Sequence, residues 1–245
     1  GAHFAFQSAQ RLKMDEISEK CNQSEGTKWF VKIDKMDQNA VWLPQKWSMQ
    51  RTQLFRQGER IQVSVIGSWW SGLTCSSEIN LRTVFENCKH GADMQISTVM
   101  QSFHEKVIAE GHLPEEFWVG ADNTPKETKN NPFCWWLIWL LCVLDGTCLW
   151  SCGMLFLIVG HTHDKIDRLF SRLRIAITGH DFDTVEKLLE VLRKRMQGFR
   201  FDSSHLSRVW DWKSLKNLEL SPFKGLPRVH ALNFFRSRGG IYVKW

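Results

Sequence analysis

The stretch at residues 156–173 (FLIVGHTHDKIDRLFSRL) places the strongest constraint on the fold of this chain. An apolar run ends in a glycine, two histidines and two aspartates follow within seven residues, and an amphipathic pattern comes next. This succession is typical of a buried strand that leads into a helix. Polar residues at the exit of a buried strand are held rigidly at a rim that faces solvent, where chemistry is usually done. We therefore expect a functional site at this junction.

Two further junctions of the same kind lie upstream. Asp34 directly follows the apolar residues of the stretch 30–38 (FVKIDKMDQ), and Asp122 follows those of the stretch 117–131 (FWVGADNTPKETKNN). Isolated aspartates at strand ends often serve as turn or cap residues, but α/β sheets also place their sites at the carboxyl edge. Hard divalent cations such as Mg²⁺ take carboxylate oxygens as ligands. Asp34, Asp122 and Asp167 together predict a metal site with enough carboxylates for two ions.

Length and composition narrow the class of protein. A chain of 245 residues has room for one large α/β domain or two small ones, and its net charge of +6 is compatible with a nucleic-acid partner. The seven cysteines form no CxxC pair, which argues against a zinc site and favours a reducing, intracellular environment. Residues 132–159 hold a single charge, Asp145, but Asp145-Gly146 divides them into pieces shorter than the ~20 residues that cross a bilayer.

The pattern along the chain predicts an α/β layer with a mixed central sheet. We expect a tight turn at Ser71-Gly72 with residues 73–78 as a hairpin partner, and a helical region over 80–110 in which Ser97 caps the longer second part. The other elements that we expect are helices over 1–22, 131–144, 162–178 and 183–196, and strands over 28–34, 60–70, 116–121, 149–159 and 240–245.

Three segments carry a resemblance to a known family: 33–44 (IDKMDQNAVWLP), 121–131 (ADNTPKETKNN) and 159–173 (VGHTHDKIDRLFSRL). They resemble a family of uncharacterised eukaryotic transposon-like proteins that carries the patterns DGMDQ, DNxxxExKN and GHTHxDIDxxFS in that order. That family is similar to RNase H-like integrase domains of DDE/DDD transposases. The resemblance implies an α/β fold, an RNase H-like mixed five-stranded sheet flanked by helices. We expect it over 27–198, after a helical lead-in over 1–26 and before a C-terminal extension over 199–245.

The resemblance also implies roles for the carboxylates. Asp34, Asp122 and Asp167 would be the metal ligands at the end of the first strand, the end of the fourth strand and the helix after the fifth. The cofactor would be Mg²⁺ or Mn²⁺, as two ions. Asp37 is the rival of Asp34, and Asp164 is the rival of Asp167 or a further ligand. In the position after Asp34, a lysine stands where the pattern has a glycine.

His161 and His163 have two interpretations. A neutral histidine beside a metal site can orient water or a phosphate, or bind a softer metal itself. Alternatively, the two side chains cap and support the loop. The sequence GHTH also ends the motif series of calcineurin-like metallophosphoesterases, but the other segments of that series are missing from this chain.

Basic and amide side chains near these junctions are candidates for DNA contacts. Lys126, Lys129 and Asn130 follow Asp122 and could hold a DNA phosphate, since such contacts position the backbone without reading sequence. The alternative is a solvated loop in which Asn130 or its neighbour caps the next helix. Arg168 and Arg172 are phosphate contacts or part of a solvated helix face.

The resemblance implies transposase-like or integrase-like cleavage and transfer of DNA strands by an acidic triad in a nuclear protein. The alternatives are a nuclease of the same fold that only hydrolyses, and a non-catalytic DNA-binding or protein-binding module. We expect DNA as the partner, with a second copy of the chain as a further candidate, and neither a membrane nor a small-molecule cofactor.

Overall fold

The structure is a computed structural model that describes residues 2–36, 41–46, 60–76, 78–85, 91–122, 128–156, 165–218, 222–226 and 229–245, with the backbone alone over 2–11. In chain order the elements are α1 (Ala2–Asn22), β1 (Lys28–Lys35), β2 (Trp42–Leu43), β3 (Ile61–Ser71), β4 (Ile79–Phe85), α2 (Ala92–Glu110), β5 (Glu116–Ala121), α3 (Asn131–Val143), β6 (Ser151–Phe156), α4 (Lys165–Ile177), α5 (Val185–Arg195), β7 (Phe201–His205), the 3-10 helix η3 (Trp212–Leu218), β8 (Ala231–Ser237) and β9 (Gly240–Lys244).

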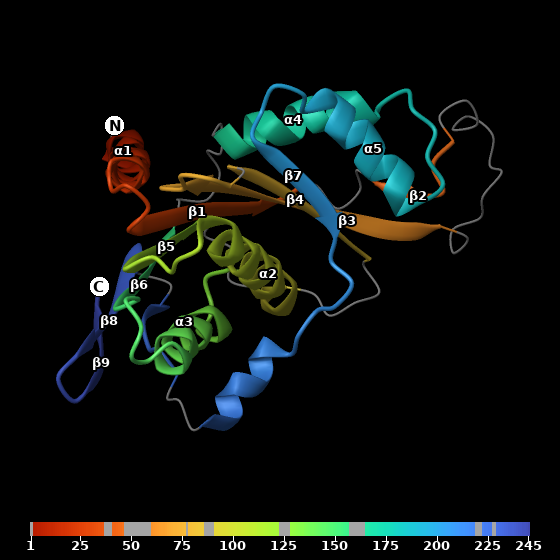
Figure 1. Cartoon of the computed structure of the whole chain (residues 1–245). Coiled ribbons are helices and arrows are strands. Elements are labelled where there is room, and N and C mark those ends of the chain that lie inside the picture. Colours follow the sequence, from red (N-terminus) through yellow and green to blue (C-terminus); the bar gives the residue numbers. More distant parts are fainter. Residues whose placement is uncertain are drawn as a thin grey trace.

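Within the described residues, nine strands form one mixed sheet in the order β7-β4-β3-β1-β5-β6-β8-β9, with β2 paired to β3 (Figure 1). β3 is antiparallel to both β1 and β4, whereas β1, β5 and β6 are parallel to one another. The carboxyl ends of these three parallel strands therefore meet at one edge of the sheet.

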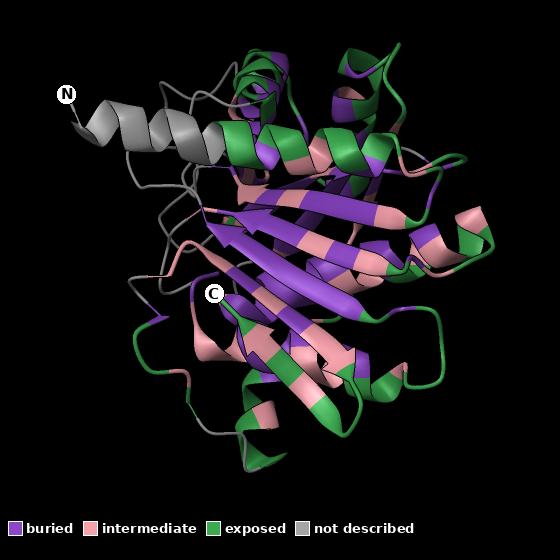
Figure 2. Cartoon of the chain, turned by 90° about the vertical axis from the view of Figure 1, so that its left-hand side faces the viewer, coloured by how far each residue is buried: buried purple, intermediate pink, exposed green. Residues whose placement is uncertain are grey.

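Helices cover both faces of the sheet (Figure 1). On one face, Trp29, Val31 and Ile33 of β1 pack with apolar residues of α2, α3 and η3 in the main core. On the other face, α4 and α5 pack against β3 and β4, and α1 packs against Phe30. Because both faces are covered, the central strands are buried almost throughout, while the C-terminal β9 alternates between exposed and half-buried residues (Figure 2).

Most of the expected elements are present, but the hairpin was wrongly placed. The partner of β3 is β4, which begins at Ile79, so residues 80–85 belong to a strand and not to a helix. The segment 73–78, expected to be the hairpin partner, is instead a connection held by Glu110 at the end of α2. The Glu110 carboxylate accepts hydrogen bonds from the backbone N–H groups of Thr74, Cys75 and Ser76 at 2.7–2.9 Å. Although burial would raise the pKa of Glu110, these bonds and that of the Thr74 hydroxyl lower it to about 2.

Ser97 does not cap a helix, contrary to the prediction. It lies within α2, which begins after Gly91, and its side chain is buried. Its Oγ accepts hydrogen bonds from the backbone N–H of Trp210 and from Nε1 of Trp212, both at 3.0 Å. Ser97 therefore fixes residues 210–218, which contain η3 and which we call the η3 segment, on α2.

The sheet is wider than the five strands expected. Residues 199–245, expected to be an extension, supply β7 at one edge and β8 and β9 at the other. β7 pairs with β4, and β8 pairs with β6. The C-terminal segment is thus built into the sheet on both sides of the central strands.

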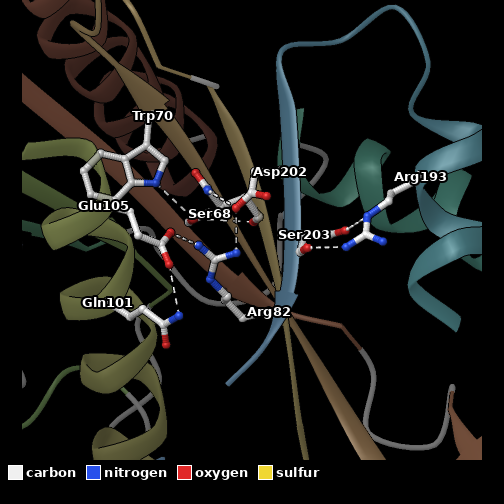
Figure 3. Close-up of polar contacts among 9 residues, drawn as sticks. Ser68, Trp70, Arg82, Gln101, Glu105, Arg193, Asp202 and Ser203 are labelled. Carbon is white, nitrogen blue, oxygen red and sulfur yellow. Dashed lines mark hydrogen bonds and ion pairs between the residues drawn. The ribbon is translucent and has the colours of Figure 1, made fainter. Parts of the chain in front are cut away.

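An ionic cluster around a buried arginine joins β7 to the helix layer below the sheet (Figure 3). Arg82 of β4 is fully buried; its Nη1 donates to Asp202 of β7 at 2.9 Å, and its Nη2 donates to Glu105 of α2. On the other side of β7, Arg193 of α5 donates from Nε to the hydroxyl of Ser203 at 3.0 Å. Since a buried guanidinium needs partners of opposite charge, these two ion pairs hold β4, β7 and α2 together.

No helix in the described part of the chain combines the length and the apolar character needed to cross a membrane.

Candidate functional site

Two of the predicted aspartates lie next to each other at the carboxyl edge of the sheet. β1 and β5 are parallel, with Ile33 opposite Ala121, and Asp34 and Asp122 are the next residue on each strand path. Both side chains are half-buried. The register therefore brings two carboxylates from distant parts of the sequence to neighbouring positions.

Both aspartates fall on the sheet face that α1 and α4 cover. Side chains alternate between faces along a strand. Phe30 and Met36 are an even number of residues from Asp34, so their side chains lie on the same face of the sheet. Phe30 packs against α1, and Met36 packs among residues of α4 and α5. In β5, Gly120 lies beneath the Phe30 ring, since a Cβ added there would meet Phe30 Cζ at 2.7 Å. Asp122 is two residues after Gly120 and therefore falls on the same face of the sheet.

Helix α4 carries Asp167 to the same region. Asp34 is paired with Gly67 of β3. The Phe170 ring of α4 lies over this glycine, because a Cβ at Gly67 would be only 2.9 Å from Phe170 Cζ. Asp167 precedes Phe170 by three residues and so lies about one turn away on the same side of the helix. The first turn of α4 is therefore close to the end of β1 that carries Asp34.

The three aspartates do not form a closed metal cage. In the ranges that the structure describes, no group of three or more His, Cys, Asp and Glu residues is positioned to hold a metal ion. One oxygen of Asp34 accepts the backbone N–H of Lys35 at 2.8 Å. The donor set nevertheless suits Mg²⁺ or Mn²⁺, since such ions are usually held by one or two carboxylates with water and substrate phosphates completing the shell. Asp34 and Asp122 supply those two carboxylates.

Five predicted site residues lie outside the described residues. They are Asp37, Lys126, His161, His163 and Asp164.

Lys129 and Asn130 are turned toward the protein. Lys129 is buried, its Nζ lies 5.2 Å from the centre of the Phe156 ring, and burial lowers its pKa. Phe156 is paired with Ala121, the residue before Asp122, so this lysine lies at the same edge of the sheet. Asn130 caps α3, because its side chain accepts the N–H of Phe133 at 3.2 Å. The cap that we considered as the alternative for Asn130 is confirmed.

Successive residues of a helix are about 100° apart, so Arg168 and Arg172 lie on a different flank of α4 from Asp167. With Lys165 they line a groove of about 240 Å³, whose other walls are Trp69, Leu169 and Phe199. The Lys165 ammonium lies 6.0 Å from the Trp69 ring, and the Arg172 guanidinium 5.9 Å from the Phe199 ring. We call this the basic groove; the three cations are accompanied by no acidic side chain among its described lining residues.

Sequence reasoning missed four residues of the basic groove, namely Lys165, Leu169, Trp69 and Phe199. Lys165 could have been found, because Lys165, Arg168 and Arg172 recur at intervals of three and four residues and so share one side of a helix. Trp69 and Phe199 could not, because their proximity to α4 depends on how β3 and the segment after α5 pack.

A protein-family model described as a domain of unknown function (DUF7869) matches residues 55–244, which is more than half of the chain. No curated protein matches the chain.

Proposed function

This chain belongs to the DUF7869 family, and because the function of that family is unknown, we propose from the site itself that the protein cleaves and transfers DNA strands with the help of divalent metal ions. The observation that carries the proposal is that Asp34 and Asp122 directly follow the paired residues Ile33 and Ala121, at the carboxyl ends of two neighbouring parallel strands. The helix that bears Asp167 packs over the residue paired with Asp34.

The arrangement of the central strands supports an RNase H-like assignment, which is part of the proposal. β1, β3 and β4 form an antiparallel unit, α2 leads to β5, and α3 leads to β6 beside it. In this order Asp34 belongs to the first core strand, Asp122 follows the fourth and Asp167 begins the helix after the fifth. The resemblance of the sequence to transposase-like proteins implies the same three positions.

The carboxylates of Asp34, Asp122 and Asp167 would hold the ions. Two bound divalent ions would supply an activated nucleophile and stabilise the leaving oxygen of a phosphodiester. The N–H of Lys35 restrains one oxygen of Asp34, which limits the directions that this carboxylate can take. Lys129 is buried at the same edge of the sheet, with its ammonium over the Phe156 ring, and burial lowers its pKa.

The basic groove would bind the DNA backbone. Lys165, Arg168 and Arg172 provide three cations on one side of α4, and Trp69 and Phe199 provide ring faces between them. Cations beside aromatic faces are the combination that binds nucleic-acid strands without reading sequence. Because these contacts are electrostatic, binding should weaken steeply as salt rises.

The proposal is tested by cleavage of plasmid and short duplex DNA with Mg²⁺ or Mn²⁺. We expect metal-dependent nicking by the wild type and a loss of about 100-fold or more in Asp34→Asn and Asp122→Asn, because metal stabilisation contributes several kcal/mol at about 1.4 kcal/mol per tenfold. Asp145→Asn is the matched control, since Asp145 is 75% exposed and paired with Arg236 rather than placed near β1 and β5.

The outcomes separate the alternatives. Nicking that persists in both aspartate variants would exclude these residues as the catalytic carboxylates. Hydrolysis without joining of a free 3′-hydroxyl end would identify a nuclease. Salt-sensitive DNA binding without cleavage under either metal would identify a binding module.

A further inference from the structure

A large aromatic cavity lies on the face of the sheet opposite α4. It has a volume of about 680 Å³ and lies between α2, α3 and the η3 segment. In Figure 1 this segment is the blue helix below α2 and α3. Trp139 of α3 and Trp210 and Trp212 of the η3 segment are among its walls, with Asp211 and His104 beside them. We call this the tryptophan cavity; the strand-end aspartates are on the other side of the sheet.

The walls of the tryptophan cavity are fixed by buried polar groups. Ser97 of α2 binds the backbone of Trp210 and the indole N–H of Trp212. Asp93, which is 2% exposed, accepts the backbone N–H of Lys213 at 3.0 Å and lies 3.4 Å from the Lys213 ammonium. Because both anchors come from α2, the segment that carries two of the tryptophans is held in place without a ligand.

The three indole rings meet at steep angles. The Trp212 and Trp139 ring centres are 5.3 Å apart with an angle of 68° between the planes, and the Trp212 and Trp210 centres are 6.3 Å apart with an angle of 63°. The face of an aromatic ring carries partial negative charge. A corner of tryptophan faces attracts a cation, and such cages are the known means of binding quaternary ammonium groups.

The charge of the lining agrees with a cationic ligand. Among its described residues, Asp211 is the single side chain with a formal charge when histidine is counted as neutral, and neither lysine nor arginine is present. The chain as a whole carries +6. A negative, tryptophan-walled cavity in a basic protein is suited to a cation with an apolar surface. We propose that the tryptophan cavity binds a methylated ammonium group.

The test compares choline with 3,3-dimethylbutan-1-ol, which has the same shape but no charge, by titration calorimetry and tryptophan fluorescence on the full chain. We expect saturable binding of choline and at least about tenfold weaker binding of the neutral alcohol, because cation–π attraction requires the charge. Equal binding of the two, or no binding of choline, would overturn the proposal without the use of any variant.

Variants locate the site. Trp210→Ala should weaken choline binding about tenfold and Trp210→Phe less, since a smaller ring keeps part of the attraction. Trp210 is 40% exposed, and its backbone N–H, which binds Ser97, is unchanged by the substitution. Trp150→Ala is the matched control, because Trp150 is 43% exposed and lies outside the cavity. Equal weakening by the control would contradict the assignment.

A second comparison distinguishes the source of the ammonium group. A short peptide with one trimethyllysine is titrated beside the same peptide with lysine. Tighter binding of the methylated peptide than of choline indicates a protein side chain as the ligand, and tighter binding of choline indicates a free molecule. Binding of the unmethylated peptide equal to that of the methylated one would contradict the proposal. None of these readouts depends on DNA cleavage.

Discussion

Lys106 is a charged residue in a position that disfavours charge. It lies on α2, is 3% exposed, and its ammonium is 6.0 Å from the Trp70 ring. Burial lowers its pKa to about 8, although Asp202 and Glu105 act to raise it and Arg82 acts to lower it further. The folded protein therefore binds the proton of Lys106 less tightly than the unfolded chain does.

The lowered pKa of Lys106 predicts that the contribution of this residue to the free energy of unfolding is more favourable at high pH than at neutral pH. A folded-state pKa below the unfolded value of 10.5 means that stability is gained as pH rises from about 8 to above 10. We expect the free energy of unfolding of the wild type to rise by roughly 3 kcal/mol relative to Lys106→Met over this interval, at about 1.4 kcal/mol per pKa unit. Urea unfolding at a series of pH values measures the difference.

The comparison with Lys106→Met removes the effect of every other group that titrates in this range. Lys216→Met serves as a control, because Lys216 lies in η3 and is exposed. A difference between wild type and Lys106→Met that stays constant from pH 7 to pH 10.5 would mean that Lys106 is not held in its buried position.

At the scale of single residues, the sequence predicted the candidate site in part. The position of Asp34 and Asp122 at strand ends follows from local pattern, because an apolar run that stops at an aspartate marks the end of a buried strand. The burial of Lys129 could not be predicted, since it depends on Phe156 from the next strand along the sheet. A lysine in a polar segment gives no local sign that tertiary packing will cover it.

At the scale of elements, three glycines of the sheet leave room for aromatic rings. Gly67 of β3 lies under Phe170, Gly120 of β5 under Phe30, and a Cβ at Gly153 of β6 would be 2.2 Å from Trp118. These contacts lie on the face that α1 and α4 cover. The missing side chain at Gly67 leaves room for the Phe170 ring, so that α4 can lie close to the strand end bearing Asp34. Gly120 and Gly153 leave room for rings of the neighbouring strands.

Gly67→Ala should therefore displace α4. The added methyl group would meet Phe170 Cζ at 2.9 Å, and we expect a destabilisation of about 1–3 kcal/mol from overpacking. Phe170→Leu removes the ring tip, so the double variant should be more stable than the sum of the two single changes predicts. Denaturant unfolding of the four proteins measures the coupling.

The control cycle combines Gly67→Ala with Ile175→Ala, since Ile175 is on α4 but is 72% exposed. In this cycle the changes in the free energy of unfolding of the two single variants should add up to that of the double variant. Additive effects in the Gly67 and Phe170 cycle as well would show that the ring does not rest on the glycine, and would remove the link between α4 and Asp34.

Elements with strong local periodicity were predicted well. The strand over 116–121 and the helix over 131–144 correspond to β5 and α3, because each is apolar and ends at clear turn signals. β4 was missed because its buried positions include Asn80 and Arg82, which are polar. Asn80 and Arg82 donate hydrogen bonds to Asp202 of β7 and, for Arg82, to Glu105 of α2, and such nonlocal partners leave no periodic signal in the sequence.

At the scale of the whole molecule, the chain folds as one sheet whose C-terminal part completes both edges. β7 is parallel to β4 and β8 is antiparallel to β6, so residues far apart in the sequence become neighbours. Trp212, Leu232 and Phe234 belong to the same buried core as Trp29 and Phe117. Of the three strands in this region, β9 was expected over 240–245, whereas β7 and β8 were missed because their conformation depends on pairing with β4 and β6 more than on composition.

Removal of residues 199–245 should therefore abolish cooperative folding. A chain that ends at 198 lacks β7, η3 and β8, so it exposes the pairing edges of β4 and β6 and loses buried core residues, including Trp212 and Phe234. A chain that ends at 238 lacks only β9, an edge strand with exposed and half-buried side chains, and should unfold cooperatively with a modest loss of stability. Urea unfolding followed by circular dichroism and tryptophan fluorescence compares both with the full chain. A typical domain has a free energy of unfolding of about 5–15 kcal/mol. If the chain that ends at 198 unfolds in a single transition, with a free energy of unfolding within about 2 kcal/mol of that of the full chain, then the core is complete without residues 199–245.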